Sequence, residues 1–187
     1  MSKKINQKPG SIELICGSMF SGKTEEFIRR VKRAVIAKQK ILLFKPKKDD
    51  RYEANHIISH EGRKIESIVV GKTSDIVDKL KDVTYDVVGI DEVQFFDQHI
   101  VNLCNKLADE GTRVILAGLD LDYTGKPFGP VPSLMAIADE VEKLHAICTQ
   151  CGANAHYSYR MCPVDKQVLV AGADCYMALC RKCYCEK

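Results

Sequence analysis

Short apolar runs alternate along the chain with segments in which apolar residues recur every three or four positions. The apolar runs, at residues 13–16, 41–44, 66–70, 86–90 and 113–120, predict buried strands. Helical spacing appears in residues 23–35, 73–80, 97–107 and 133–141. The polar stretch at residues 47–64 predicts a loop or flap. Strands that alternate with helices in this way predict a parallel sheet covered by helices on both faces.

The first predicted strand leads into an octet that matches the pattern G-x-x-x-x-G-K-[ST] without deviation. Its residues are Gly17, Ser18, Met19, Phe20, Ser21, Gly22, Lys23 and Thr24. Between a strand and a helix, this pattern wraps backbone N–H groups around an anionic phosphate. Lys23 would then reach the β- and γ-phosphates, and the Thr24 hydroxyl would ligate Mg²⁺. An ordinary glycine-rich turn is the alternative, but the strand before it and the helix after it favour a phosphate loop.

A second acidic motif, Asp91-Glu92, follows the apolar run at residues 86–90. Carboxylates at the end of a central parallel strand emerge at the edge where open α/β sheets bind ligands. Asp91 is then placed to hold Mg²⁺, directly or through water. The same pair could instead begin a helix, and the matching phosphate loop favours the role in nucleotide binding.

Composition narrows the class of protein. The chain has 187 residues, of which 45% are hydrophobic and 28% are charged, as in soluble globular proteins. It has no apolar run of the roughly 18–20 residues that a membrane helix needs, and its N-terminus lacks the apolar segment of a signal peptide. We therefore expect a cytoplasmic protein without a membrane partner.

Net charge is +3, but the basic residues gather in the first quarter of the chain, around the phosphate loop. This distribution suits a polyanionic ligand. We interpret Arg29, Arg30, Lys32 and Arg33 more simply, as the solvated face of the first helix. Nucleic-acid binding would need a basic stripe interleaved with aromatic residues, and the sequence contains none.

Nine cysteines are present, and most lie in the last forty residues. Two C-x-x-C pairs, Cys148 with Cys151 and Cys180 with Cys183, predict a structural Zn²⁺ site with four thiolate ligands. Cys185 could replace Cys183, so the fourth ligand is left open, and Cys162 and Cys175 are further spare thiols. Cys16 and Cys104 lie within apolar patterns and are expected to be buried. The domains expected are a flexible N-terminus at 1–11, a P-loop nucleotide-binding α/β domain at 12–147 and a zinc-binding domain at 148–187.

Taken together, these motifs resemble the type II, or cytosolic-type, thymidine kinases. The residues that carry the resemblance are the phosphate loop, the segments at 49–52, 91–96, 117–120 and 126–129, the two cysteine pairs, residues 172–174 and Tyr176. The resemblance implies a RecA-like core, a zinc-tethered lasso loop over the nucleoside and a homotetramer. It also implies transfer of the ATP γ-phosphate to the 5′-hydroxyl of thymidine or deoxyuridine, with thymidine triphosphate as a feedback inhibitor.

The resemblance also implies a role for each matching residue. Glu92 is expected to be the general base. The ATP site is expected to add Arg51 and Asp91 to the eight residues of the phosphate loop. The nucleoside site is expected to comprise Met19, Asp49, Phe95, Leu119, Phe128, Ser158, Val168, Leu169, Val170, Ala171, Gly172 and Tyr176.

Two other functions fit parts of the sequence. A zinc-ribbon module that binds nucleic acid would need a basic tail, but residues 148–187 carry only five Lys or Arg against three Asp or Glu. A P-loop kinase for a different nucleoside would share the phosphate loop and the acidic motif. The sequence does not rank thymidine against deoxyuridine.

Overall fold

The computed structural model describes residues 10–47, 56–58, 64–162 and 175–187. Within these ranges a six-stranded sheet has the order β5-β2-β6-β7-β1-β8. Its strands are β1 (Ser11–Gly17), β2 (Ile41–Pro46), β5 (Ile68–Val70), β6 (Val87–Ile90), β7 (Arg113–Gly118) and β8 (Glu140–Leu144). All neighbouring pairs run parallel, so the carboxyl ends of the strands share one edge.

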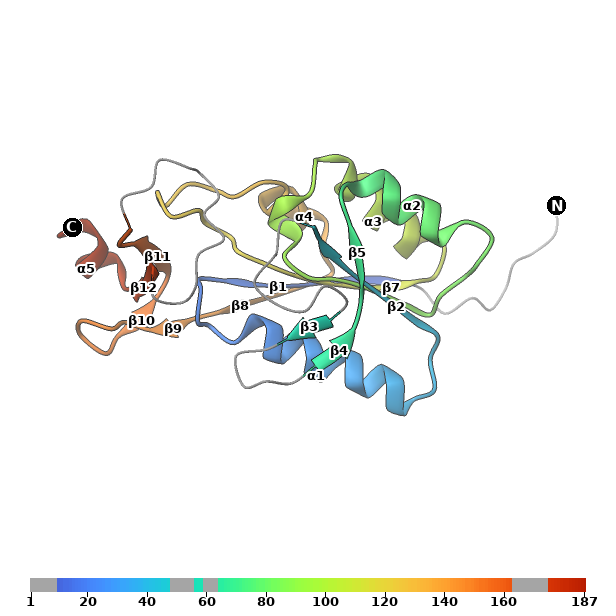
Figure 1. Ribbon diagram of the computed structural model, residues 1–187, viewed down its shortest axis with the longest axis horizontal. Helices are drawn as coiled ribbons and strands as arrows, with labels where there is room; N and C mark the ends of the chain where they lie inside the picture. The colour runs from blue at the N-terminus through green and yellow to red at the C-terminus, as the bar shows by residue number, and fades with distance from the viewer. Residues whose placement is uncertain (1–9, 48–55, 59–63, 163–174) are drawn as a thin grey trace.

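Helices cover both faces of this sheet (Figure 1). Helix α1 (Lys23–Ile36) packs on one face, where its apolar side meets β7 and β1. Helices α2 (Thr73–Leu80), α3 (His99–Asp109) and α4 (Val131–Ile137) pack on the other face, around a second apolar cluster. The predicted α/β fold, with a parallel sheet between layers of helices, is confirmed.

The apolar stripe of α1 differs in one position from the prediction. Phe27, Ile28, Val31 and Ala34 are buried as expected, but Val35 is 54% exposed. Val35 lies on the same side of the helix as Ile28 and Val31, but it is in the last turn, one residue before α1 ends at Ile36.

The apolar run predicted as one strand at residues 66–70 is divided between two sheets. Strand β4 (Lys64–Glu66) pairs antiparallel with β3 (His56–Ile58), whereas β5 joins the central sheet beside β2. Between them Ser67 is buried. The polar stretch expected to be a loop or flap therefore contains a short hairpin strand, whose Ile57 packs against the apolar cluster under α1.

The helix predicted for residues 133–141 is wrong in its second half. Helix α4 ends at Ile137, and β8 then forms the edge of the sheet beside β1. Asp139 fixes this change, because its Oδ2 accepts from Ile12 N at 2.8 Å and its own N–H donates to Ile12 O at 2.9 Å. An edge strand with one solvated face is polar enough to escape a search for apolar runs.

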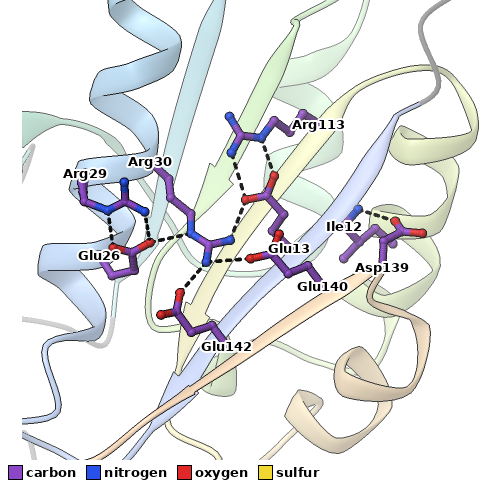
Figure 2. Close-up of polar contacts among 9 residues, drawn as sticks. All are labelled: Ile12, Glu13, Glu26, Arg29, Arg30, Arg113, Asp139, Glu140 and Glu142. Atoms are coloured by element: carbon purple, nitrogen blue, oxygen red, sulfur yellow. Dashed lines mark hydrogen bonds and ion pairs between the residues drawn. The ribbon is translucent and has the colours of Figure 1, made fainter.

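Arg30 corrects a second expectation, since it is buried rather than solvated. Its side chain, from α1, lies over β1 and β8, and Figure 2 shows four carboxylates around it. The guanidinium nitrogens lie 2.7 Å from Glu13 Oε2, 2.8 Å from Glu26 Oε1, 2.9 Å from Glu140 Oε1 and 2.5 Å from Glu142 Oε2. This network attaches the helix that follows the phosphate loop to two strands of the sheet.

Arg113 extends the network from β7 by donating to both oxygens of Glu13, at 2.5 and 2.9 Å. Burial alone would raise the pKa of Glu13, but the hydrogen bonds from Arg113 and Arg30 outweigh it and lower the pKa below the usual 4.5. A carboxylate with a depressed pKa stabilises the folded protein above its unfolded pKa, and this contribution is lost as the pH falls through the folded pKa.

Replacing Arg30 with Met is expected to lower the free energy of unfolding at pH 7 by about 3 kcal/mol, because it leaves Glu13 buried with one cation fewer. The difference between variant and wild type should shrink as the pH falls through the lowered pKa of Glu13, where the carboxyl gains a proton in both proteins. Urea denaturation at pH 7 and at a series of lower pH values measures this. Arg29→Met is the matched control, since Arg29 is exposed and should leave stability unchanged. Equal effects of the two variants at pH 7 would contradict the assignment.

The C-terminal part forms a small unit beyond β8, at one end of the molecule (Figure 1). It consists of β9 (Ala146–Ile147), β10 (Asn154–Ala155), β11 (Tyr157–Arg160), β12 (Tyr176–Leu179) and α5 (Arg181–Cys185). Strand β9 pairs with β10, and β11 pairs with β12. Its buried cluster is small and rich in cysteine: Ala146, Cys148, Ala155, Ala178, Leu179, Cys180 and Cys183. Among the described residues, no helix combines the length and the apolar character needed to cross a membrane.

Candidate functional site

The phosphate loop connects β1 to α1 at the carboxyl edge of the sheet. Its two glycines have positive φ angles, 142° at Gly17 and 86° at Gly22. A Cβ on Gly17 would lie 2.2 Å from Leu144 O on the neighbouring strand, so this position requires glycine. Inside the loop, Lys23 Nζ donates to Ser18 O at 2.7 Å and Ser21 Oγ donates to the same oxygen at 2.8 Å. The loop is thus folded by its own side chains, with Lys23 held across it.

The Asp91-Glu92 pair follows β6, which is separated from β1 by β7 alone. Asp91 is buried, and its Oδ1 accepts from Glu92 N at 2.9 Å. Glu92 has a φ of 50°, a left-handed conformation that is uncommon for a residue with a side chain. The chain therefore turns sharply at Glu92 before the short 3₁₀ helix η1 (Val93–Phe95). Unusual backbone conformations of this kind concentrate at functional sites.

Phe95 and Phe128 come from separate segments, and the fold brings them together. Their ring centroids lie 5.6 Å apart with the planes at 89°, an edge-to-face contact. Phe128 N donates to Asp120 O at 3.0 Å, which folds the 126–129 segment back against the end of β7. Both rings are half-buried, so they can still offer a surface to a flat ligand.

Met19 and Ser158 are also brought together, although they are far apart in the sequence. Met19 N donates to Ser158 Oγ at 2.9 Å, and Ser18 Oγ donates to Ala155 O at 3.4 Å. The C-terminal unit therefore contacts the phosphate loop directly. Sequence reasoning placed both residues near one ligand but did not find the hydrogen bond between them.

Tyr176 lies on β12 and is joined to β11. Its hydroxyl accepts from Arg160 Nε at 3.2 Å, and the Arg160 guanidinium stacks 3.6 Å from the centroid of the Tyr123 ring. Tyr184 Oη donates to Tyr123 O at 2.9 Å, which adds a second link from the C-terminal unit to the segment after β7. These contacts hold the C-terminal unit close to the loop that carries Phe128.

The four predicted zinc ligands converge at one end of the C-terminal unit. The sulfurs of Cys148, Cys151, Cys180 and Cys183 all lie within 4.8 Å of one another. A tetrahedral Zn²⁺ with bonds of about 2.3 Å separates its ligands by about 3.8 Å, so this cluster has the size and the donor set of a structural zinc site. Burial would raise the pKa of Cys148, but backbone N–H groups of Cys180, Gln150 and Cys151 lower it to about 6.

The remaining cysteines have different surroundings. Cys185 is exposed and lies outside the cluster, which leaves Cys183 in the fourth position. Cys162 and Cys175, expected to be spare thiols, form a disulfide with 5.3 Å between their Cα atoms. These two cysteines are 13 positions apart in the sequence, and the fold brings them together. Cys16 and Cys104 are buried as predicted, and burial raises their pKa values to about 11 and about 12.

Several residues that share this edge were missed by sequence reasoning. Asp120 is 5% exposed at the end of β7, and Lys143 Nζ on β8 lies 2.7 Å from its Oδ2. The hydrogen bond to Asp120 raises the pKa of Lys143. Gln94 is 2% exposed and contacts Glu92. The sequence signal that could have identified Asp120 and Gln94 was a polar residue among apolar neighbours.

Other expected site residues lie outside the described residues: Asp49, Arg51, Val168, Leu169, Val170, Ala171 and Gly172. The assignments of these residues to ATP or nucleoside stay predictions. Thr24, Leu119 and the loop residue Phe20 are described, at the same edge of the sheet as Lys23.

The fold and this site define a nucleotide-binding α/β protein of the P-loop class. The family model described as thymidine kinase matches residues 10–184. A thymidine kinase of Bacteroides fragilis (strain YCH46) is 52% identical over 178 residues, which cover 95% of this chain and 88% of the relative. Thymidine kinases of Bacteroides thetaiotaomicron and of a Rhodothermus species are 51% and 49% identical, over 95% and 94% of this chain and 88% and 81% of theirs. The chain belongs to the thymidine kinase family.

Proposed function

We propose that this protein is an ATP-dependent thymidine kinase, which transfers the γ-phosphate of ATP to the 5′-hydroxyl of thymidine, and of deoxyuridine, in deoxynucleotide salvage. The observation that carries the proposal is that the phosphate loop and the Asp91-Glu92 pair share one edge of the sheet in a chain of this family. Phosphoryl transfer needs mainly positioning and charge neutralisation, and both can be supplied from that edge.

Phosphate binding is assigned to the loop of residues 17–24. Its backbone N–H groups and the N-terminus of α1 would hold the ATP phosphates. Lys23, which already crosses the loop to Ser18 O, would exchange that contact for the β- and γ-phosphates. Arg51 is proposed to add a second positive charge beside the transferring group.

Thr24 and Asp91 would hold Mg²⁺, since hydroxyl and carboxylate oxygens suit this ion. When bound, Mg²⁺ supplies neutralisation of the phosphate charge. The two ligands come from the first turn of α1 and from the end of β6. The zinc proposed at the four cysteines would have a structural role and would take no part in phosphoryl transfer.

Glu92 is proposed as the general base that accepts the proton of the 5′-hydroxyl. It follows Asp91 directly, at the position where the chain turns sharply after β6. Phe95 and Phe128 would form aromatic walls for the pyrimidine. Met19, Leu119 and Ser158 would line the space around the 5-methyl group, with Asp49, residues 168–172 and Tyr176 completing the nucleoside site.

Finer properties are proposed from the resemblance to the family. They are a homotetrameric assembly, feedback inhibition by thymidine triphosphate and a cytoplasmic location. The contacts between the C-terminal unit and the phosphate loop support a single active unit made of both parts.

The test is an assay of ATP-dependent phosphorylation across a panel of nucleosides. We expect turnover of thymidine and deoxyuridine, and little or none of cytidine, adenosine or guanosine. Product is identified as the 5′-monophosphate by chromatography. Absence of turnover with every pyrimidine deoxynucleoside, by a zinc-loaded protein, would overturn the proposed function.

A further inference from the structure

Gln94 joins the ends of two neighbouring strands of the sheet. Its Nε2 donates to Glu92 Oε2 at 2.5 Å, just after β6, and its Oε1 accepts from Leu119 N at 3.1 Å, just after β7. The orientation of the amide follows from its partners, since the carboxylate accepts and the backbone N–H donates. Both ends of this buried side chain are therefore occupied by defined contacts.

Two glycines make room for Gln94 in this position. A Cβ on Gly118 would lie 2.7 Å from Gln94 Oε1, and a Cβ on Gly129 would lie 2.3 Å from Gln94 O. Gly129 also has a φ of 53°. Three segments that are separate in the sequence, at 91–96, 117–120 and 126–129, therefore meet at Gln94.

Glu92 lies at a sharp turn of the chain, where a hydrogen bond from the buried Gln94 restricts its side-chain rotamers. It precedes a 3₁₀ helix of three residues and has a left-handed φ of 50°. A glutamate side chain has three rotatable bonds, and each unfixed rotamer lowers the fraction of time that a base points at its proton. A hydrogen bond to a carboxylate from a buried donor is among the stronger ones.

We propose that Gln94 is a positioning residue for phosphoryl transfer, which aims the Glu92 carboxylate and ties it to the segment of Leu119 beside the acceptor. The inference rests on the proposed function, in which Glu92 is the general base. It assigns to Gln94 an effect on the chemical step rather than on the binding of either substrate.

Two substitutions separate the contacts of Gln94. Gln94→Met keeps length and volume but removes both hydrogen bonds. Gln94→Glu keeps an oxygen for Leu119 N but loses the donor to Glu92. We expect each to lower kcat about 10- to 100-fold, with KM for thymidine and for ATP changed less than threefold, because a misplaced base costs rate and not affinity. Gln98→Met is the matched control, since the Gln98 amide is exposed and donates to Gly129 O at 3.3 Å.

A purely structural role would lower the thermal midpoint and leave kcat intact below it. The double variant Gln94→Met with Glu92→Gln gives a further readout, because Gln94 can affect kcat only through an intact base. Adding Gln94→Met to Glu92→Gln should therefore reduce kcat less than threefold further. Wild-type kcat in both Gln94 variants, with Glu92→Gln inactive, would overturn the role of Gln94 alone. An active Glu92→Gln would overturn the proposed base itself.

Gly118→Ala tests the position of the Gln94 amide by a change in a neighbouring residue. The added methyl would displace the Gln94 amide, so we expect loss of kcat with KM retained. The same substitution made in Gln94→Met, whose thioether lacks the hydrogen-bonded oxygen, should have a smaller effect on kcat. Equal losses in the two backgrounds would contradict the coupling.

Discussion

Glu92→Gln is expected to lower kcat for thymidine phosphorylation by about 10²- to 10⁴-fold, the usual contribution of a positioned general base. The substitution removes one ionisable oxygen and keeps the size and shape of the side chain. Because glutamine retains an oxygen, the hydrogen bond from Gln94 Nε2 can persist, and the fold should be unaffected. KM for ATP should change little, since the phosphate loop and Asp91 are untouched. Steady-state kinetics with varied thymidine and varied ATP measures both constants.

The matched control is Glu110→Gln, at an exposed position after α3. It should leave kcat within twofold of the wild type. Comparable thermal midpoints for both variants would show that lost activity reflects chemistry and not unfolding. A Glu92→Gln protein with more than a third of wild-type kcat would contradict the assignment of the base.

Removal of zinc is expected to have the second large effect, on folding and activity together. Three of the seven members of the buried cluster in the C-terminal unit are proposed zinc ligands, and three of the others are alanines. So little apolar surface stabilises the fold only weakly, whereas structural zinc sites supply about 10–16 kcal/mol of apparent binding free energy. Cys148→Ser combined with Cys180→Ser should therefore lose zinc and expose the tail to proteolysis.

Activity should be lost with the metal, because the C-terminal unit supplies Ser158 Oγ to Met19 N and Ala155 O to Ser18 Oγ. Zinc content by mass spectrometry, limited proteolysis and thymidine turnover would be measured on the same preparations. Cys185→Ser is the control, since this exposed thiol lies outside the cluster, and it should keep metal, protection and activity. Stoichiometric zinc in the double serine variant would overturn the ligand set.

The periodicity of apolar residues predicted most of the sheet and the helices that cover it. The prediction failed where a polar residue or segment is nevertheless part of the sheet or buried. Strand β8 carries Glu140 and Glu142, so its sequence is polar. It nevertheless pairs with β1, because Asp139, directly before β8, is hydrogen-bonded to Ile12. Arg30 occupies a helical position that reads as solvated, yet it is buried because carboxylates from other elements neutralise it. No local pattern contains those distant partners.

The candidate site divides in the same way. Local sequence patterns predicted the phosphate loop, the acidic pair after β6 and the two cysteine pairs, with Cys183 and Cys185 both open as the fourth ligand. Each of these chemistries needs certain residue types at a short, set spacing. The resemblance assigned Phe95, Phe128, Met19 and Ser158 to one site, but their direct contacts are seen only in the folded chain. The folded chain also pairs Cys162 with Cys175 and joins Gln94 to both Glu92 and Leu119. Those contacts depend on the order of parallel strands and on the packing of the C-terminal unit against the loop after β1, which are properties of the whole chain.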